Sequence, residues 1–340
     1  MHRRIVMIAL AAVIIAPGCA QTQPSAPIDP DLLKRNARQT LINHTTNPSP
    51  LLRCHAIEAI AQSRQADAME FVVAALGDDY PGVRFAACLA IISMRWQGGA
   101  KMLLTTVNDS NGSVRAAAAG ALHTLGDARY TSLIGKAITD PDVTVRRNAA
   151  MVLGAMGQPA AIRVLKQASR DDDISVRLQA TEAMAVLGSK RSQRLMRTYC
   201  QSVYDDESIM AMMVLARSAK KKTLTGDDRE VASEQIADIF ERTRQKDRLG
   251  MRLVAARALA MLDDNRGQNV ALESLHFKSQ DPNQVARIRK LAVLALAEMP
   301  DRAIIPQLAL LLDDGDPDVR IAAAMAVLRA LDGVAGGEEL

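Results

Sequence analysis

Arginine and aspartate recur at fixed spacing and are the most regular charged side chains of the chain. Arginines stand 31 residues apart from Arg53 to Arg177, and again from Arg289 to Arg320, and an aspartate stands six residues before most of them. An arginine can donate paired hydrogen bonds to a carboxylate, and an aspartate ahead of a helix can accept from its free N–H groups. We expect each aspartate to cap the next helix and each arginine to reach an adjacent unit. The predicted structural ladder consists of Asp78, Arg84, Asp109, Arg115, Asp140, Arg146, Asp171, Arg177, Asp314 and Arg320.

The histidines and cysteines lack the spacing that catalysis or metal binding requires. None of the five histidines is followed by Glu, and none pairs with another histidine at helical spacing. There is no glycine-rich phosphate loop, no HExxH motif and no nucleophile elbow. The four cysteines match no zinc or CxxC pattern, and Cys88 is read as a small core residue. The sequence therefore predicts no catalytic residue, no metal site and no cofactor.

The amino terminus has the pattern of an export signal. Met1-His2-Arg3-Arg4 precedes an apolar run from Ile5 to Ala16, which is too short to cross a bilayer as a helix. The run is followed by Pro17-Gly18-Cys19, and the segment Ala16-Pro17-Gly18-Cys19 resembles the lipobox of bacterial lipoproteins. That resemblance implies lipidation of Cys19 and, because residue 20 is not Asp, sorting to an outer membrane if the organism has one. The alternative is an ordinary signal peptide in which Cys19 has no role.

The positions around each arginine predict the helices that carry the ladder. Relative to the arginine, apolar residues recur at −1, +3, +6 and +7, and Ala fills position +3 in eight of nine units. These offsets trace one helical face, and small side chains on it let neighbouring helices approach closely. Gly126, Gly157 and Gly188 follow at +11, where a helix end favours a left-handed residue. A shorter helix is expected before each of these, for example at 66–76, 129–138 and 302–312.

The pattern D-x4-V-R-x2-A-A-x-A-L-x-x-L-G resembles the short HEAT-like repeats found in phycobilin lyases. The best matches run from Asp109 to Gly126, Asp140 to Gly157 and Asp171 to Gly188. The resemblance covers about residues 30–332 and implies an all-α fold, an α-α superhelix or HEAT-like solenoid of about nine helix pairs. It is specific for fold and unspecific for function.

One unit departs from the repeat. Met210 takes the place of the arginine, Arg217 and Lys220 enter the expected apolar face, and the spacing to Arg252 grows to 42 residues. We hypothesise a kink or altered twist near 200–250 that exposes a partner-binding surface at Lys220, Lys221 and Lys222; neutral divergence with a solvated charge run is the alternative. The expected segments are a signal (1–18), a lipidated tether (19–29), regular repeats (30–198), a degenerate repeat (199–250), further repeats (251–332) and a tail (333–340).

Composition favours a binding protein. Of 42 basic residues, two lie in the signal, which leaves 40 against 38 acidic residues, a near balance that argues against a nucleic-acid partner. The leading hypothesis is a monomeric, non-catalytic scaffold that binds protein partners and is anchored by its lipid in the bacterial cell envelope. The alternative is a lyase- or chaperone-like accessory factor that binds a tetrapyrrole or a client protein.

Overall fold

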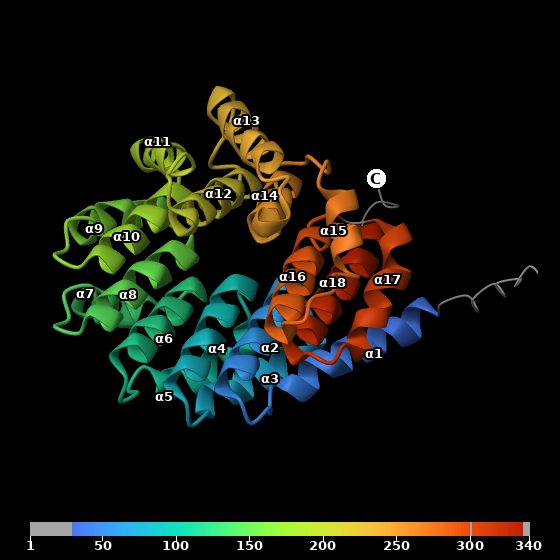
Figure 1. Ribbon diagram of the computed structural model, residues 1–340. Helices are drawn as coiled ribbons and strands as arrows, with labels where there is room; N and C mark the ends of the chain where they lie inside the picture. The colour runs from blue at the N-terminus through green and yellow to red at the C-terminus, as the bar shows by residue number, and fades with distance from the viewer. Residues whose placement is uncertain (1–28, 300, 336–340) are drawn as a thin grey trace, which may run out of the picture.

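The computed structural model describes residues 29–299 and 301–335, and in them 18 α-helices form two layers (Figure 1). The outer helices are α1 (Pro30–His44), α3 (Met69–Ala74), α5 (Ala100–Thr106), α7 (Ser132–Ala137), α9 (Ile162–Ala168), α11 (Lys190–Tyr199), α13 (Asp227–Arg242), α15 (Gln268–Ser274) and α17 (Ile305–Leu310). The inner helices are α2 (Pro50–Gln62), α4 (Pro81–Met94), α6 (Gly112–Thr124), α8 (Val143–Met156), α10 (Ile174–Val186), α12 (Asp205–Lys220), α14 (Leu249–Ala260), α16 (Pro282–Leu296) and α18 (Pro317–Ala335). The predicted all-α fold of nine helix pairs is confirmed.

The predicted alanines form the contact surface between inner helices. Ala87, Ala118 and Ala149, each three residues after its arginine, are fully buried. Gly120 shows how closely the helices approach, because a Cβ atom there would lie only 2.6 Å from Cγ1 of Val152 on the next inner helix. Small residues at these positions allow backbones to pack without voids.

The predicted left-handed residues end the inner helices. Gly126, Gly157 and Gly188 have φ values of 103°, 73° and 96°, a conformation that glycine adopts without steric cost. The prediction of left-handed conformation at these three positions is confirmed.

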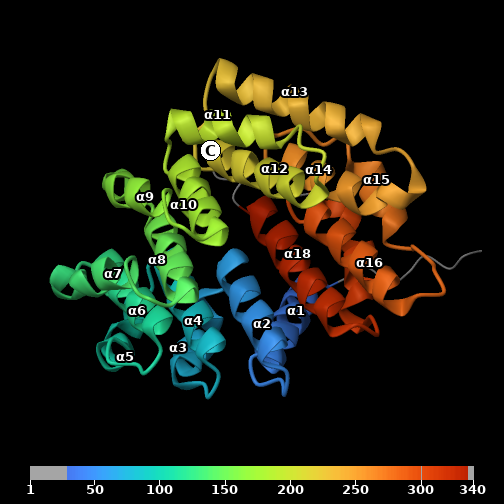
Figure 2. The same ribbon diagram turned by 60° about the vertical axis from the view of Figure 1, so that its left-hand side comes forward.

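The two ends of the described chain meet, so the inner helices form a closed ring. Each inner helix packs against the next from α2 to α18, and α18 packs in turn against α1 and α2. Figure 2 shows α18 beside α2 and α1, although these helices lie at opposite ends of the sequence. Lys34 Nζ lies 2.5 Å from Asp332 Oδ1, and Gln65 Nε2 donates to Asp332 Oδ2 over 3.0 Å. The repeat pattern did not predict this closure.

The inner layer continues through the region of the degenerate repeat, because α12 packs against both α10 and α14. What distinguishes this unit is the length of α12. From its N-cap Tyr204 to the left-handed Lys222 there are 18 residues, whereas the equivalent span in α8, from Asp142 to Gly157, is 15 residues. The expected equivalence of Met210 to the repeat arginine is therefore wrong, since counting from the two ends of α12 gives Ser208 or Ala211. The added residues amount to almost one helical turn.

The signal segment and Cys19 lie outside the described residues, as does the end of the tail. Among the residues that are described, no helix is both long and apolar enough to span a membrane.

Candidate functional site

The repeat arginines join consecutive units. Nε and Nη2 of Arg84 donate to Oδ2 and Oδ1 of Asp109 over 2.6 and 2.8 Å, and Arg53 binds Asp78 in the same way over 2.7 Å for each bond. Arg146 reaches Asp171 over 2.8 and 3.0 Å. In each pair the aspartate lies 25 residues after the arginine, so the arginine reaches forward to the turn that precedes the next inner helix.

The same guanidinium groups also close their own turns. Nη1 of Arg84 donates to the carbonyl oxygens of Asp78 and Asp79 over 2.8 and 3.2 Å. Arg115, Arg177 and Arg320 make the corresponding bonds in their own turns. Each guanidinium therefore satisfies carbonyl groups that no helix would satisfy.

The paired aspartates are largely buried and charged. Burial acts to raise the pKa of Asp109, but hydrogen bonds from Arg84 and from the backbone N–H of Asn111 outweigh it, and the pKa is lowered. The pKa of Asp171 is lowered chiefly by its hydrogen bonds from Arg146. These carboxylates are thus held as anions within a structural network, which agrees with a structural role.

The ladder has gaps. Within the described part of the chain, no ion pair joins Arg115 to Asp140, and Ser202 stands where Arg177 would need an acid. The pattern returns at the other end, where Arg289 Nη1 donates to Asp314 Oδ2 over 2.8 Å.

The ladder aspartates do not cap the helices, contrary to expectation. The N-cap residues stand four positions before the arginine, as Asn111, Asp142 and Asp173 do. The ladder aspartates stand two residues too early to reach the first free N–H groups of the helix. They accept instead from the backbone N–H two residues on, over 2.8 to 2.9 Å; the acceptors are Asp78, Asp109, Asp140, Asp171 and Asp314.

Arg217 and Lys220 do not enter an apolar face, also contrary to expectation. Both are exposed on α12, because the added length of this helix changes which residues face its neighbours. Arg217 forms an ion pair with Glu182 on α10, and Lys220 Nζ lies 2.5 Å from Glu298 Oε2 at the end of α16. Lys221 and Lys222 line two separate surface pockets at the same edge of the ring.

Glu298 is the centre of a cationic cluster that the sequence did not reveal. Its side chain is only 4 % exposed, and Arg329 donates to its two oxygens over 3.0 and 2.7 Å. Arg257 Nη2 lies 3.6 Å away. Burial opposes ionisation, yet Arg329 and Lys220 together lower the pKa of Glu298 to about 2.

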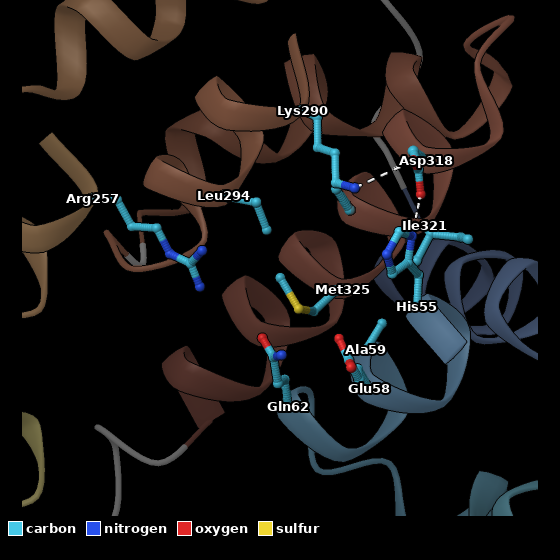
Figure 3. Close-up of a pocket in the computed structure, with 11 residues that line it drawn as sticks. His55, Glu58, Ala59, Gln62, Arg257, Lys290, Leu294, Asp318, Ile321 and Met325 are labelled. Carbon is cyan, nitrogen blue, oxygen red and sulfur yellow. Dashed lines mark hydrogen bonds and ion pairs between the residues drawn. The ribbon is translucent and has the colours of Figure 1, made fainter. Parts of the chain in front are cut away.

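A pocket of about 190 Å³ lies beside this cluster, on the inner side of α2, α14, α16 and α18 (Figure 3). At one side of it, His55 Nδ1 lies 2.5 Å from Asp318 Oδ1, and Lys290 Nζ lies 3.3 Å from Asp318 Oδ2. Because α2 and α18 are distant in the sequence, this pocket exists only in the closed ring.

One sequence signal does mark these missed residues. Glu58 and Arg257 both stand five positions after their arginine, and Glu298 and Arg329 both stand nine positions after theirs. Most other units place apolar or small residues such as Leu89, Gly120 or Met151 at the first of these positions, and Glu182 is the exception. Charges at inward-facing offsets therefore point to the interior. Glu298 finds Arg329 on the next inner helix, whereas Glu58 and Arg257 line one pocket only because the ring closes.

The cysteines of the described region carry no disulfide, and Cys88 is buried as expected. Burial raises the pKa of Cys54 to about 11 and that of Cys200 to about 12. Among the described residues, no group of three His, Cys, Asp or Glu side chains is placed to hold a metal ion.

Alternating inner and outer helices in register, with the same ion pair repeated between units, define an α/α repeat protein. The sequence profile of HEAT repeats matches residues 38–104 and 99–185. These residues contain HEAT repeats, as the motif predicted, and helix pairs of the same kind continue to α18. No curated protein sequence matches it.

Several solved structures are similar to the chain. The complex of CpcE and CpcF of phycocyanin lyase from Nostoc sp. PCC7120 is 20% identical, with 83% of this chain and 98% of that chain covered and a TM-score of 0.40. Human deoxyhypusine hydroxylase is 18% identical, with 81% and 98% covered and a TM-score of 0.36. A mutant of Kap121p is 14% identical, with 88% and 37% covered and a TM-score of 0.33. Likeness at this level carries no conclusion about activity.

Proposed function

We propose that this HEAT-like repeat protein is a non-catalytic, protein-binding scaffold of the bacterial cell envelope, anchored by a lipid on Cys19. One observation carries the protein-binding part: the most exposed apolar side chains gather at one edge of the ring. In the described residues, six large apolar side chains are more than half exposed, and all lie where outer helices end and inner helices begin. This apolar rim consists of Leu51, Tyr80, Ile174, Val203, Tyr204 and Leu310.

The rim has the chemistry of a protein contact. Val203 and Tyr204 are 88% and 68% exposed, and exposed apolar groups bordered by polar residues are typical of interaction sites. They form two groups: Leu310, Leu51 and Tyr80 belong to neighbouring helix pairs around α18, α2 and α4, and Ile174, Val203 and Tyr204 to those of α10 and α12. Exposed carboxylates accompany both groups, for example Asp79 and Asp172. We expect a protein partner with apolar side chains flanked by basic residues.

Anchoring rests on the amino-terminal pattern. The apolar run before Gly18-Cys19 and the Gln-, Pro- and Ser-rich segment after it suit a lipidated cysteine on an extended tether. A Cys19→Ala variant should move from the membrane fraction to the soluble fraction of the native cells. Retention of this variant in the membrane fraction would contradict a lipid anchor at Cys19.

Site-directed photocrosslinking in the native envelope tests the binding surface. A photoreactive residue at position 204 should crosslink one partner protein, and the same residue at position 104, on outer helix α5, should not. The double variant Val203→Ser, Tyr204→Ser should lose that partner on affinity capture, whereas the matched variant Met102→Ser, Leu104→Ser should keep it. Equal capture by both variants would contradict the rim proposal.

Two further measurements test the other candidates. Lys221→Glu with Lys222→Glu tests the lysines as a second surface. Visible absorbance of the purified protein would favour the tetrapyrrole alternative.

A further inference from the structure

The pocket inside the ring contains two groups of opposite charge that the protein leaves without good partners. Glu58 of α2 and Arg257 of α14 face the pocket from different sides (Figure 3). Within the described part of the chain, the Glu58 carboxylate has no hydrogen bond or ion pair. Nε of Arg257 is buried without an acceptor. Its nearest carboxylate, Glu298, lies 3.6 Å away and is already bound by Arg329 and Lys220.

The other charged groups of the pocket are satisfied. Asp318 is held by His55 at 2.5 Å and by Lys290 at 3.3 Å. The contrast matters most for Arg257, because a buried charge is costly unless something pairs with it. The Glu58 carboxylate is exposed at the pocket and free to accept hydrogen bonds from a ligand. Glu58 and Arg257 are therefore the two positions where a ligand would gain most.

The pKa shifts of Glu58 and Arg257 also favour a charged ligand at these two positions. Burial raises the pKa of Glu58, although His55 and Lys290 act in the opposite direction. Burial also lowers the pKa of Arg257, and the neighbouring Arg329 and Arg217 add to this effect despite Glu298. Both shifts mean that the surrounding protein disfavours the charged form, and a ligand group of opposite charge would relieve each one.

The remaining wall is apolar. Leu294, Ile321 and Met325 line the pocket together with the two charged groups. Its volume of about 190 Å³ is below the roughly 300–1,000 Å³ of pockets that take drug-sized ligands. The occupant is thus a small molecule with an apolar part.

We infer that this pocket binds a small zwitterion with an apolar side chain, its ammonium group held by Glu58 and its carboxylate by Arg257. A free apolar amino acid and a short apolar peptide share this chemistry. Such a ligand goes beyond the proposed scaffold function, and it would bridge α2 to α14, α16 and α18 across the point where the ring closes. Binding should therefore raise the melting temperature of the whole ring.

Isothermal titration of the full chain with leucine and with the dipeptide leucyl-leucine tests the inference, and the stronger ligand identifies the source. For that ligand, the Nα-acetyl derivative removes the ammonium and the amide derivative removes the carboxylate. We expect each derivative to bind at least about tenfold more weakly, the loss of roughly one charge-assisted contact. Binding of neither zwitterion at millimolar concentration would overturn the proposal.

Matched variants assign the two ends. Glu58→Gln should bind the zwitterion and its Nα-acetyl derivative alike while still discriminating against the amide, and Arg257→Gln should show the reverse. Glu70→Gln and Arg163→Gln, which change exposed residues of the outer helices α3 and α9, should behave as wild type. Because Glu58 makes no contact to lose, its variant keeps the test valid if Arg257→Gln fails to fold. Unchanged discrimination in Glu58→Gln would contradict the assignment. The rim variant Val203→Ser, Tyr204→Ser should leave this affinity unchanged, which separates the pocket from the protein-binding surface.

Discussion

Each complete rung of the ladder, meaning an arginine paired with the aspartate 25 residues later, uses its arginine for two purposes. Arg84 holds the turn before its own helix through two carbonyl groups and holds the next unit through Asp109. Exposed ion pairs contribute little to stability. A bidentate pair with a carboxylate that is only 9% exposed differs, because removing one partner leaves a charge desolvated. The main effect of breaking such a pair on stability is therefore the unpaired, desolvated carboxylate that remains, and the lost attraction between the two charges contributes less.

The gap in the ladder provides a control for this argument. Arg84→Ala removes two turn bonds and the pair with Asp109, whereas Arg115→Ala removes only the corresponding turn bonds. We expect Arg84→Ala to lower the free energy of unfolding by about 1–3 kcal/mol more than Arg115→Ala, since hydrogen bonds to charged groups have that magnitude. Urea unfolding of both variants measures the difference. Equal losses would show that the rung adds nothing to the turn.

Glu298 should make stability depend on pH in acid. Its pKa is lowered from 4.5 to about 2, so its ionised form stabilises the fold above about pH 4.5, and this contribution disappears as the pH falls through about 2. The shift corresponds to about 3 kcal/mol. Urea unfolding from pH 6 to pH 2 should show a steep acid loss that is smaller in Glu298→Gln than in wild type. Glu70→Gln should follow wild type. An unchanged slope in Glu298→Gln would contradict the role assigned to Arg329 and Lys220.

At the scale of the helices, much of the structure follows from local pattern. The spacing of the arginines and alanines predicts the inner helices and their buried face, and Gly126, Gly157 and Gly188 end helices as predicted. The repeat pattern did not predict the residues of α12 that match those of the other inner helices. An insertion of almost one turn keeps the apolar period of the helix but moves each equivalent position by up to three residues. Tyr204 and Lys222, which fix its ends, carry no recognisable capping signal. The caps were misassigned because aspartate is common both at N-caps and in the turns before them.

Close approach of the inner helices makes a glycine essential at one position. A methyl group on Gly120 would lie 2.6 Å from Cγ1 of Val152 and 3.5 Å from Cδ1 of Ile92. We expect Gly120→Ala to destabilise the protein by about 1–3 kcal/mol, the usual cost of overpacking. Gly135→Ala, in outer helix α7 with nothing within 4 Å, should stabilise it by about 0.5–1 kcal/mol. Thermal unfolding compares the two, and a stabilised Gly120→Ala would show that the inner layer is loosely packed.

At the scale of the molecule, closure decides where the candidate site lies. Whether an array of repeats closes depends on the small rotation between units summed over the whole array, and no single repeat motif encodes that sum. The sequence therefore revealed the ladder, which joins neighbours, but not the pairing of His55 with Asp318 or the pocket beside it. Those residues become partners only when the ninth unit returns to the first.

Closure also predicts how the ends of the molecule behave. In an open array the terminal units have one neighbour and lose structure first, whereas here α1 packs against α18 and the Lys34–Asp332 ion pair joins residues 298 positions apart. Hydrogen exchange in α2 and α18 should therefore be as slow as in α6 and α8.

Ala37 offers a sharp test of closure, because it is fully buried on the face of α1. Ala37→Asp places an unpaired carboxylate there at a cost of several kcal/mol, and it should accelerate amide exchange in α18 at the far end of the chain. Arg35→Asp introduces the same side chain on the exposed face of α1 and should leave α18 protected. Faster exchange confined to α1 in the Ala37 variant would show that the ring is open in solution.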